Sequence, residues 1–315
     1  MYNSIHDSPE FVLFEYSFNF VSLAVFSSYF LIFATAIVVI KMCKMYYWHK
    51  GTNTVGYIHK NLFNSFVWME IANLFFFLFD NLVFRLPSTG ILTSLCAPIS
   101  PNHFLKLSYM LQLFTNYSSM FYSFLFCIVR LLIVYFPEKH EQYCSKLFKV
   151  YIPLTIILPI IFDFFMIPAL GYCRTLPAPY PNGSIFISFA ETWLGLRTDP
   201  MHLPFSLGCP VLIVIVNVAL VMKIRKTIVE SRALHNRSSY RSEVSLTCTT
   251  LAIIVPFLAN ASMTFVSLFF RDLSSYVLLI RCPLTDFSMA LVPWIFYLSH
   301  PLFSRKAKVH TVSNT

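Results

Sequence analysis

Five polar or ionisable side chains lie within apolar stretches of this sequence, where they could form an internal polar network. They are Glu70, Asn73 and Asp80 in the stretch 62–84, and Asp286 and Tyr297 in the stretch 277–298. On a helix the first three share an arc of about 100°, and the last two share one face. Carboxylates are costly inside a membrane and normally mark an internal site. Three interpretations fit them: an ion-binding or switching network, a ligand pocket, or plain hydrogen bonds between helices.

A second set of polar residues recurs every three or four positions along the stretch 105–137. It comprises Ser108, Gln112, Asn116, Ser119, Ser123, Cys127 and Arg130. Leu, Phe and Met occupy most of the remaining positions, so on a helix the polar residues form a stripe about 100° wide. Lipid satisfies neither hydrogen bonds nor charge, so this stripe must face other helices or water. We therefore interpret 105–137 as the central helix of a bundle.

The outer half of this bundle, near Ser108, Gln112 and Asn116, is the expected place of ligand binding. The surrounding side chains are mainly aromatic and aliphatic, and such a cavity suits a small, largely apolar molecule. Asn260, in the stretch 244–270, is assigned to the same ligand-binding set.

The composition indicates which elements position these residues. Hydrophobic residues make up 57% of the 315-residue chain and charged residues 12%, whereas soluble globular proteins carry about 25% charged residues. Apolar stretches recur without an intervening soluble domain, at 20–40, 62–84, 105–137, 150–170, 203–222, 244–270 and 277–298. The predicted fold class is therefore an all-α membrane protein, a bundle of seven transmembrane helices.

The distribution of Lys and Arg predicts the orientation, because these residues favour the cytoplasmic side of a membrane. With the amino terminus outside and the carboxyl terminus cytoplasmic, 17 of the 23 Lys and Arg residues lie on the inner side. The other six are assigned to the outer side: Arg85, Lys106, Arg174, Arg197, Arg271 and Arg281. The net charge of +9 then lies against the cytoplasmic leaflet, so nucleic acid is not expected as a partner.

The outer loop between the fourth and fifth spans carries two further features. Cys173 in this loop and Cys96, just before the third span, both face an oxidising compartment, so a disulfide between them is expected. The alternatives are that Cys282 takes one of the two, or that all three stay free. Asn182 begins an Asn-Gly-Ser sequon and is a candidate glycosylation site.

Arg130 lies at the cytoplasmic end of the third span, on the same face as the polar stripe. It could anchor the inner ends of neighbouring helices and be released to a partner on activation. Alternatively, it could snorkel to the membrane boundary. We favour the first interpretation, because Arg130 is not on the lipid side.

No catalytic or metal-binding pattern is recognised in the sequence. His140-Glu141 is not followed by a second histidine four residues after the first, and the eight cysteines form no CxxC pair. There is neither a glycine-rich phosphate loop nor a nucleophile elbow. We predict no enzymatic activity, no cofactor and no metal.

Seven spans in this orientation, with an arginine closing the third, resemble a G-protein-coupled receptor. More specifically, the chain resembles the nematode serpentine chemoreceptors of the class gamma superfamily, in the class U branch. The segments that carry this resemblance are NYSSMFYSFLFCIVRLLIVYFPEKHEQYC (116–144), VNVALVMKIRK (216–226) and VPWIFYLSHPLF (292–303). The resemblance covers nearly the whole chain. It implies G-protein coupling through the inner loops, sensing of an external small molecule, and a multi-pass plasma-membrane location in chemosensory neurons.

From this resemblance we expect a chemosensory receptor in which Arg130, Arg225 and Lys226 couple to the G protein. Its partners would be membrane lipid, a heterotrimeric G protein on the cytoplasmic side and an unknown small molecule outside. The chain would form one domain, 1–315, with short tails at 1–19 and 302–315. Two alternatives remain: a transporter or channel whose path is lined by the three intramembrane carboxylates, and a membrane protein that retains the fold without signalling.

Overall fold

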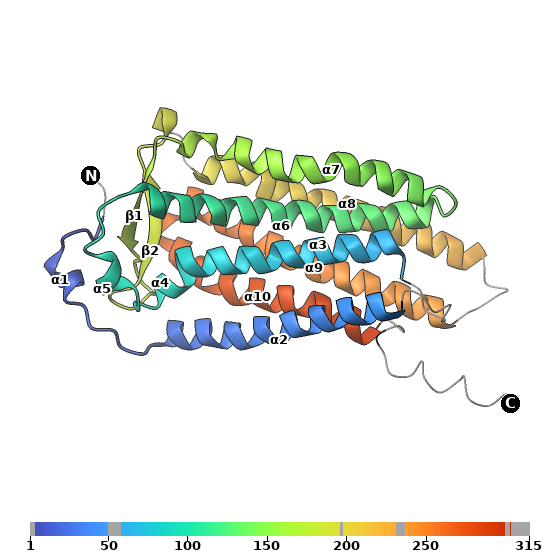
Figure 1. The fold of residues 1–315 in the computed structure, drawn as a ribbon, viewed down its shortest axis with the longest axis horizontal. Coiled ribbons are helices and arrows are strands. Elements are labelled where there is room, and N and C mark those ends of the chain that lie inside the picture. Colours follow the sequence, from blue (N-terminus) through green and yellow to red (C-terminus); the bar gives the residue numbers. More distant parts are fainter. Residues whose placement is uncertain (1–3, 50–57, 196–197, 231–236, 300–302, 304–315) are drawn as a thin grey trace.

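The computed structural model describes residues 4–49, 58–195, 198–230, 237–299 and 303, which form an elongated bundle of helices (Figure 1). Seven helices of these residues are long and apolar enough to cross a membrane. They are α2 (Phe20–His49), α3 (Lys60–Asp80), α6 (His103–Tyr135), α7 (His140–Phe162), α8 (Thr198–Glu230), α9 (Arg237–Phe269) and α10 (Ser274–Ser299). The predicted seven-helix fold is confirmed.

Most helices extend beyond the apolar stretches that predict them. For example, α8 runs about a turn further at its start and two turns further at its end than the stretch 203–222. Hydropathy marks only the part that suits lipid, whereas backbone hydrogen bonds continue a helix into water. The fourth span is shifted instead: α7 ends at Phe162, and a 3₁₀ turn, η2 (Phe164–Met166), follows. The expectation of a helix to residue 170 is wrong, because Leu170 begins a strand.

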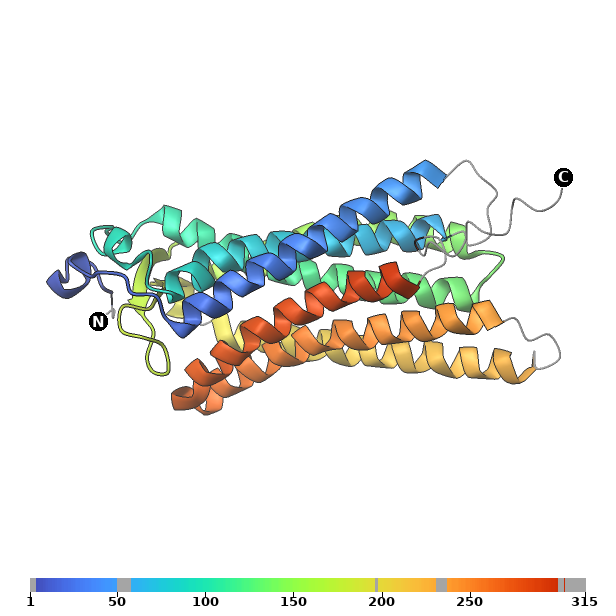
Figure 2. The ribbon, with the colours of Figure 1, turned by 90° about the horizontal axis from the view of Figure 1, so that it is seen from below.

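The helix α6 lies at the centre of the bundle, as predicted. It packs against α3, α7 and α8, and most of its residues from Thr115 to Arg130 are buried. On another side of the bundle, α10 lies between α2 and α9 (Figure 2). Aromatic side chains join these layers: the rings of Phe66 on α3 and Phe296 on α10 stack with centroids 4.6 Å apart. The polar stripe of α6 therefore faces protein.

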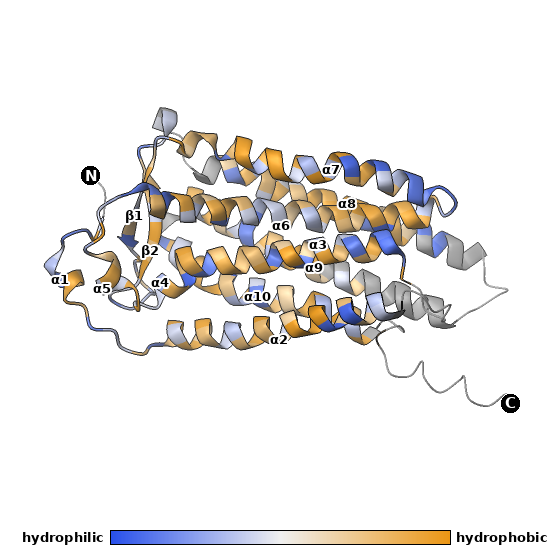
Figure 3. Ribbon diagram, in the orientation of Figure 1, coloured by the Kyte–Doolittle hydropathy of each residue, from blue (hydrophilic) through white to orange (hydrophobic). Residues whose placement is uncertain are grey.

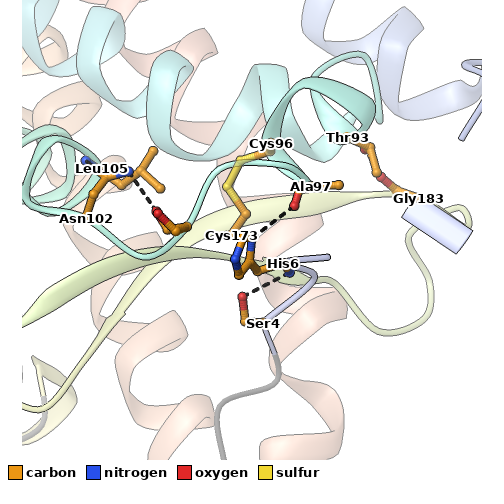
Figure 4. Close-up of a disulfide and its surroundings, with 10 residues drawn as sticks. Ser4, His6, Thr93, Cys96, Ala97, Asn102, Leu105, Cys173 and Gly183 are labelled. Atoms are coloured by element: carbon orange, nitrogen blue, oxygen red, sulfur yellow. Dashed lines mark hydrogen bonds between the residues drawn. A yellow bond between two sulfur atoms is a disulfide. The ribbon is translucent and has the colours of Figure 1, made fainter. Parts of the chain in front are cut away.

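One end of the bundle carries an antiparallel β-hairpin that the sequence did not predict, and we call it the hairpin end. It consists of β1 (Leu170–Thr175) and β2 (Ile185–Ala190). A disulfide joins Cys173 of β1 to Cys96 at the end of α5 (Thr93–Cys96), as expected (Figure 4). Cys282 keeps a free thiol. The disulfide therefore ties the hairpin to the segment that leads into α6.

The hairpin is further held by close backbone contacts. Gly171 pairs with Asn102, which caps the start of α6 by accepting a hydrogen bond from Leu105 N–H at 2.9 Å. A Cβ at Gly171 would lie 2.2 Å from the backbone nitrogen of Lys106. Ile5 N–H donates to the Cys173 carbonyl at 3.2 Å, so the amino-terminal segment also lies on the hairpin.

Apolar residues make up most of the length of the helices (Figure 3), and many of them are exposed. On α2, for instance, Phe30 is 80% exposed, and Phe33 and Ile40 are also exposed. Exposed apolar surface of this extent is unfavourable in water. Lipid tails are themselves apolar, so such side chains are stable against them. The helical backbone satisfies its own hydrogen bonds and therefore needs no water there.

Candidate functional site

Four charged side chains meet inside the hairpin-end half of the bundle, and we call them the ion cluster. Asp80 ends α3, Arg85 follows it, and Arg281 and Asp286 lie on α10. Arg85 Nε lies 2.6 Å from Asp80 Oδ2, Arg85 Nη1 lies 2.5 Å from Asp286 Oδ2, and Arg281 Nη2 lies 3.1 Å from Asp80 Oδ1. Asp80, Arg85 and Asp286 are at most 2% exposed. Two positive and two negative charges therefore balance inside the bundle.

A π-helical turn, η1 (Asn81–Arg85), brings Arg85 to Asp80. In an α-helix, side chains five positions apart point about 140° away from each other. In a π-helix the backbone bonds join residues five apart, and here Leu86 N–H donates to the Asn81 carbonyl. Side chains five apart then lie one turn above the other. The turn therefore lets Arg85 bind the carboxylate that precedes it and the carboxylate of α10.

Neutral side chains complete the cluster from three other helices. Gln112 Nε2 on α6 donates to Asp80 Oδ1 at 2.9 Å, and Ser28 Oγ on α2 donates to Asp286 Oδ2 at 2.6 Å. Arg281 Nη1 donates to Asn260 Oδ1 on α9 at 3.2 Å. The ion cluster therefore connects α2, α3, α6, α9 and α10, and a movement of any of these helices changes its contacts.

A cavity of about 20 Å³ lies beside the ion cluster. Its polar lining comes from four helices and comprises Asn73, Asn116, Ser119, Ser123, Asn260, Thr285 and Ser288. Asn260 belongs to both places, because it accepts from Arg281 and its Nδ2 donates to Asn116 Oδ1 at 3.5 Å. A cavity of this volume has room for one water molecule. It is far smaller than the pockets of about 300 Å³ or more that enclose small-molecule ligands.

The structure separates the four predicted ligand-binding residues. Asn116 and Asn260 line the cavity, whereas Gln112 binds Asp80 in the ion cluster. Ser108 is half-buried nearer the start of α6, where its hydroxyl donates to the Phe104 carbonyl at 3.2 Å. The spacing along α6 gave the correct face, but not the depth at which each side chain meets its neighbours.

The predicted polar network is likewise divided. Asp80 and Asp286 meet through Arg85, while Asn73 accepts a hydrogen bond from Ser119 at 2.5 Å in the cavity wall. Glu70 is buried apart from them, with no partner for its Oε1 among the described residues. Tyr297 lies towards the end away from the hairpin, with Lys41 Nζ 5.1 Å from its ring centroid.

Two arginines of the ion cluster correct the charge count made from the sequence. Arg85 and Arg281 were assigned to the outer side, but both lie inside the bundle and pair with Asp80. A signal for them was present, because a carboxylate in an apolar span needs a cation within reach. Asp80 and Arg85 are five residues apart, a spacing that α-helical geometry excludes and a π-turn allows.

Comparison with known proteins decides the family. The profile of the serpentine type 7TM GPCR chemoreceptor family Sru matches residues 5–306. The chain belongs to this family. Serpentine receptor class U-26 of Caenorhabditis elegans is 33% identical over 273 residues, which cover 85% of this chain and 92% of that relative.

The fold is similar to that of squid rhodopsin, with a TM-score of 0.60 over 98% of this chain and 89% of that chain. At 13% identity this likeness shows the shared seven-helix fold. The Sru family is a family of receptors and not of enzymes. The resemblance to class U serpentine receptors is confirmed, and the protein is a seven-transmembrane receptor.

The end of this serpentine receptor away from the hairpin carries the residues assigned to G-protein coupling. Arg225 and Lys226 are exposed near the end of α8, whereas Arg130 is buried, with its guanidinium 5.9 Å from the Phe126 ring centroid. Residues 231–236, which follow α8, and the tail from 304 onwards lie outside the described residues. Asn182, the predicted glycosylation site, is exposed at the opposite, hairpin end.

Two histidines, His59 and His140, meet at the end of the receptor away from the hairpin. Their Nε2 atoms lie 2.6 Å apart, and the donor atoms of His59, His140 and Glu141 lie within 4.8 Å of one another, a spacing that could hold a metal ion. The hydrogen bonds instead describe a neutral pair. His140 Nδ1–H donates to the Pro137 carbonyl at 2.6 Å, and His59 Nδ1 accepts from Asn61 N–H at 3.3 Å. His59 Nε2 then carries a proton, and this N–H donates a hydrogen bond to His140 Nε2. The protonated His59 Nε2 has no lone pair for a metal, and the lone pair of His140 Nε2 accepts this hydrogen bond.

The environment of the pair favours this neutral form. Burial and then the neighbouring His140 lower the pKa of His59 below its ordinary value of 6.5, and Glu141 opposes the shift. A proton added to either ring would displace one of the hydrogen bonds just described, because every ring nitrogen already donates or accepts one.

Proposed function

We propose that this receptor detects a small molecule on the outside of the plasma membrane and activates a heterotrimeric G protein on the cytoplasmic side. The observation that carries the proposal is the chemical difference between the two ends of the bundle. The hairpin end has a disulfide and the Asn182 sequon, both suited to an oxidising exterior. The other end presents Arg225 and Lys226. In this proposal 1–315 forms one domain, with the amino terminus outside and the carboxyl terminus inside.

Ligand binding would shift an equilibrium between inactive and active arrangements of the helices. The cavity lined by Asn116 and Asn260 is the starting point for the ligand site. Because it holds only about 20 Å³, a ligand must bind a more open arrangement than this one. That opening would move α9 or α10, both of which the ion cluster joins to α3 and α6. The change would reach Arg130 at the far end of α6.

The conduction path considered as an alternative is less well supported. Asp80 and Asp286 are each bound by an arginine, so neither presents a free carboxylate to a passing cation. The third carboxylate, Glu70, lies apart from them. Paired charges of this kind suit an element that holds helices in place.

The orientation is tested first, with glycosidase treatment and a carboxyl-terminal tag in intact cells. A glycan at Asn182 that is absent from Asn182→Gln, with a tag inaccessible to antibody, would support the receptor orientation. An accessible tag without a glycan would place the basic loops outside and refute the proposal. Nucleotide exchange on a purified G protein, driven by a ligand found in a compound screen, then tests the coupling itself.

A further inference from the structure

Two buried polar atoms of α10 have no hydrogen-bond partner among the described residues. They are Arg281 Nε and Thr285 Oγ1. Both residues lie on α10 four positions apart, and residues with this spacing share one face of a helix. Thr285 is only 3% exposed and lines the cavity. A buried donor or acceptor without a partner is costly, so such atoms indicate a place where a water molecule or a ligand binds.

The guanidinium of Arg281 is linked to the cavity through Asn260, a residue of the cavity lining. Its Nη2 binds Asp80 and its Nη1 binds Asn260, which itself lines the cavity. Both terminal nitrogens thus have an acceptor, whereas the Nε–H has none among the described residues. The neighbouring thiol of Cys282 is only a weak acceptor. The Thr285 hydroxyl can donate or accept, so the two residues together offer a place for one polar group.

The charge balance of the ion cluster limits what that group can be. Two arginines already face two aspartates, so a carboxylate in the cavity would leave one negative charge uncompensated and would compete with Asp80 for Arg281. An ammonium group would find no Asp or Glu among the cavity-lining residues. Burying an unpaired ion in a low-dielectric interior is strongly unfavourable. A neutral acceptor adds a hydrogen bond and no charge.

The remaining walls of the cavity are apolar. They are formed by Phe76, Ile253, Pro256, Phe257, Met289 and Val292. The unbranched side chain of Met289 can repack to enlarge the cavity, because methionine has three rotatable bonds. The rest of the bound molecule must therefore be apolar and small.

We propose that the ligand is a small neutral molecule with one hydrogen-bond acceptor, such as a ketone or an ester, whose oxygen binds Arg281 Nε–H and the Thr285 hydroxyl. This inference rests on the proposed function, because it names the chemical class that the same site would detect. It assigns to Arg281 and Thr285 the selection of ligands by charge as well as by shape.

The test measures ligand binding directly, on the purified receptor in detergent, without a G protein. Methyl ketones and methyl esters of short chain length are compared with carboxylates, primary amines and alkanes of equal length, as concentration-dependent shifts of the melting temperature. The ketones and esters should stabilise the receptor, while the ions and alkanes should not. Equal stabilisation by carboxylates, amines or alkanes, or no stabilisation by any carbonyl compound, would overturn the inference.

Variants then locate the binding. Thr285→Val keeps the branched shape without the hydroxyl and should weaken carbonyl binding by up to about tenfold. Arg281→Lys keeps the positive charge beside Asp80 but lacks Nε–H and should weaken binding at least as much. Arg174→Lys, at an exposed position of β1, is the matched control and should bind as the unaltered receptor does. Unchanged carbonyl affinity in Thr285→Val would also overturn the inference.

This design separates the inference from the proposed function. Carbonyl binding without nucleotide exchange on any G protein would support the ligand class and contradict the coupling. Nucleotide exchange driven only by an ionised compound would support the coupling and contradict the ligand class.

Discussion

Replacing Arg85 by methionine would leave two buried carboxylates without their shared cation. The guanidinium lies 2.6 Å from Asp80 and 2.5 Å from Asp286, and all three side chains are at most 2% exposed. Methionine keeps an unbranched chain beside the Phe77 ring, whose centroid lies 4.7 Å from the guanidinium. Removing one partner of a buried ion pair costs about 3–5 kcal/mol. Such a loss lowers the ratio of folded to unfolded receptor roughly a hundred- to several-thousand-fold.

Most of this loss should arise at Asp286. Asp80 keeps Arg281 and Gln112, whereas Asp286 keeps the hydroxyl of Ser28. The double variant Arg85→Met/Asp286→Asn removes one charge of each sign and leaves the Asp80–Arg281 pair intact. It should therefore recover most of the stability that the single variant loses.

The assay is thermal unfolding of the purified receptor in detergent, together with surface expression in cells. Arg174→Met, at an exposed arginine of β1, should stay within about 0.5 kcal/mol of the unaltered receptor. If Arg85→Met were as stable as that control, the buried pairs would contribute nothing. If the double variant were no more stable than the single one, the loss would not come from an unpaired carboxylate. Either result would refute the reasoning.

Three further predictions concern other parts of the receptor. Arg130→Ala should weaken ligand-driven nucleotide exchange while surface expression stays intact, and unaltered exchange would remove the role assigned to this arginine. The pKa of His59 is lowered from 6.5 in the folded receptor. As the pH falls below 6.5, the unfolded chain therefore binds more protons than the folded one. The stability contributed by the His59–His140 pair is complete above pH 6.5 and is lost below it. His59→Asn, which retains an N-cap acceptor, should flatten the melting temperature across this range, and an equally steep profile would contradict the assignment. Gly171→Ala should reduce surface expression, because its Cβ would lie 2.2 Å from the α6 backbone. Gly208→Ala is the control and should not reduce it, because a Cβ there would meet no atom within 4 Å. Equal surface expression of the two variants would contradict this prediction.

The sequence predicted the seven spans because each one must be apolar along a length set by the membrane. It predicted the Cys96–Cys173 disulfide because both cysteines were assigned to the same outer side. The hairpin was missed because its strands have six residues each, and β1 carries Gly, Cys and Arg where alternating apolar residues would signal a strand. Such short strands form through contacts with α6 and α5, which are distant in the sequence.

The ion cluster shows why the polar site was harder to predict than the spans. Counting Lys and Arg by position treats each one as a surface charge, but the place of Arg85 and Arg281 depends on which carboxylates can reach them. Asp80 and Asp286 lie in different spans, and only the folded bundle brings both within 2.6 Å of Arg85. A balanced set of buried charges connects five helices and carries no net charge that would compensate a buried ion. If the proposed ligand site is correct, the same residues hold this arrangement of the helices together and restrict the ligand to neutral molecules, so a variant that unbalances the cluster should alter stability and ligand selection together.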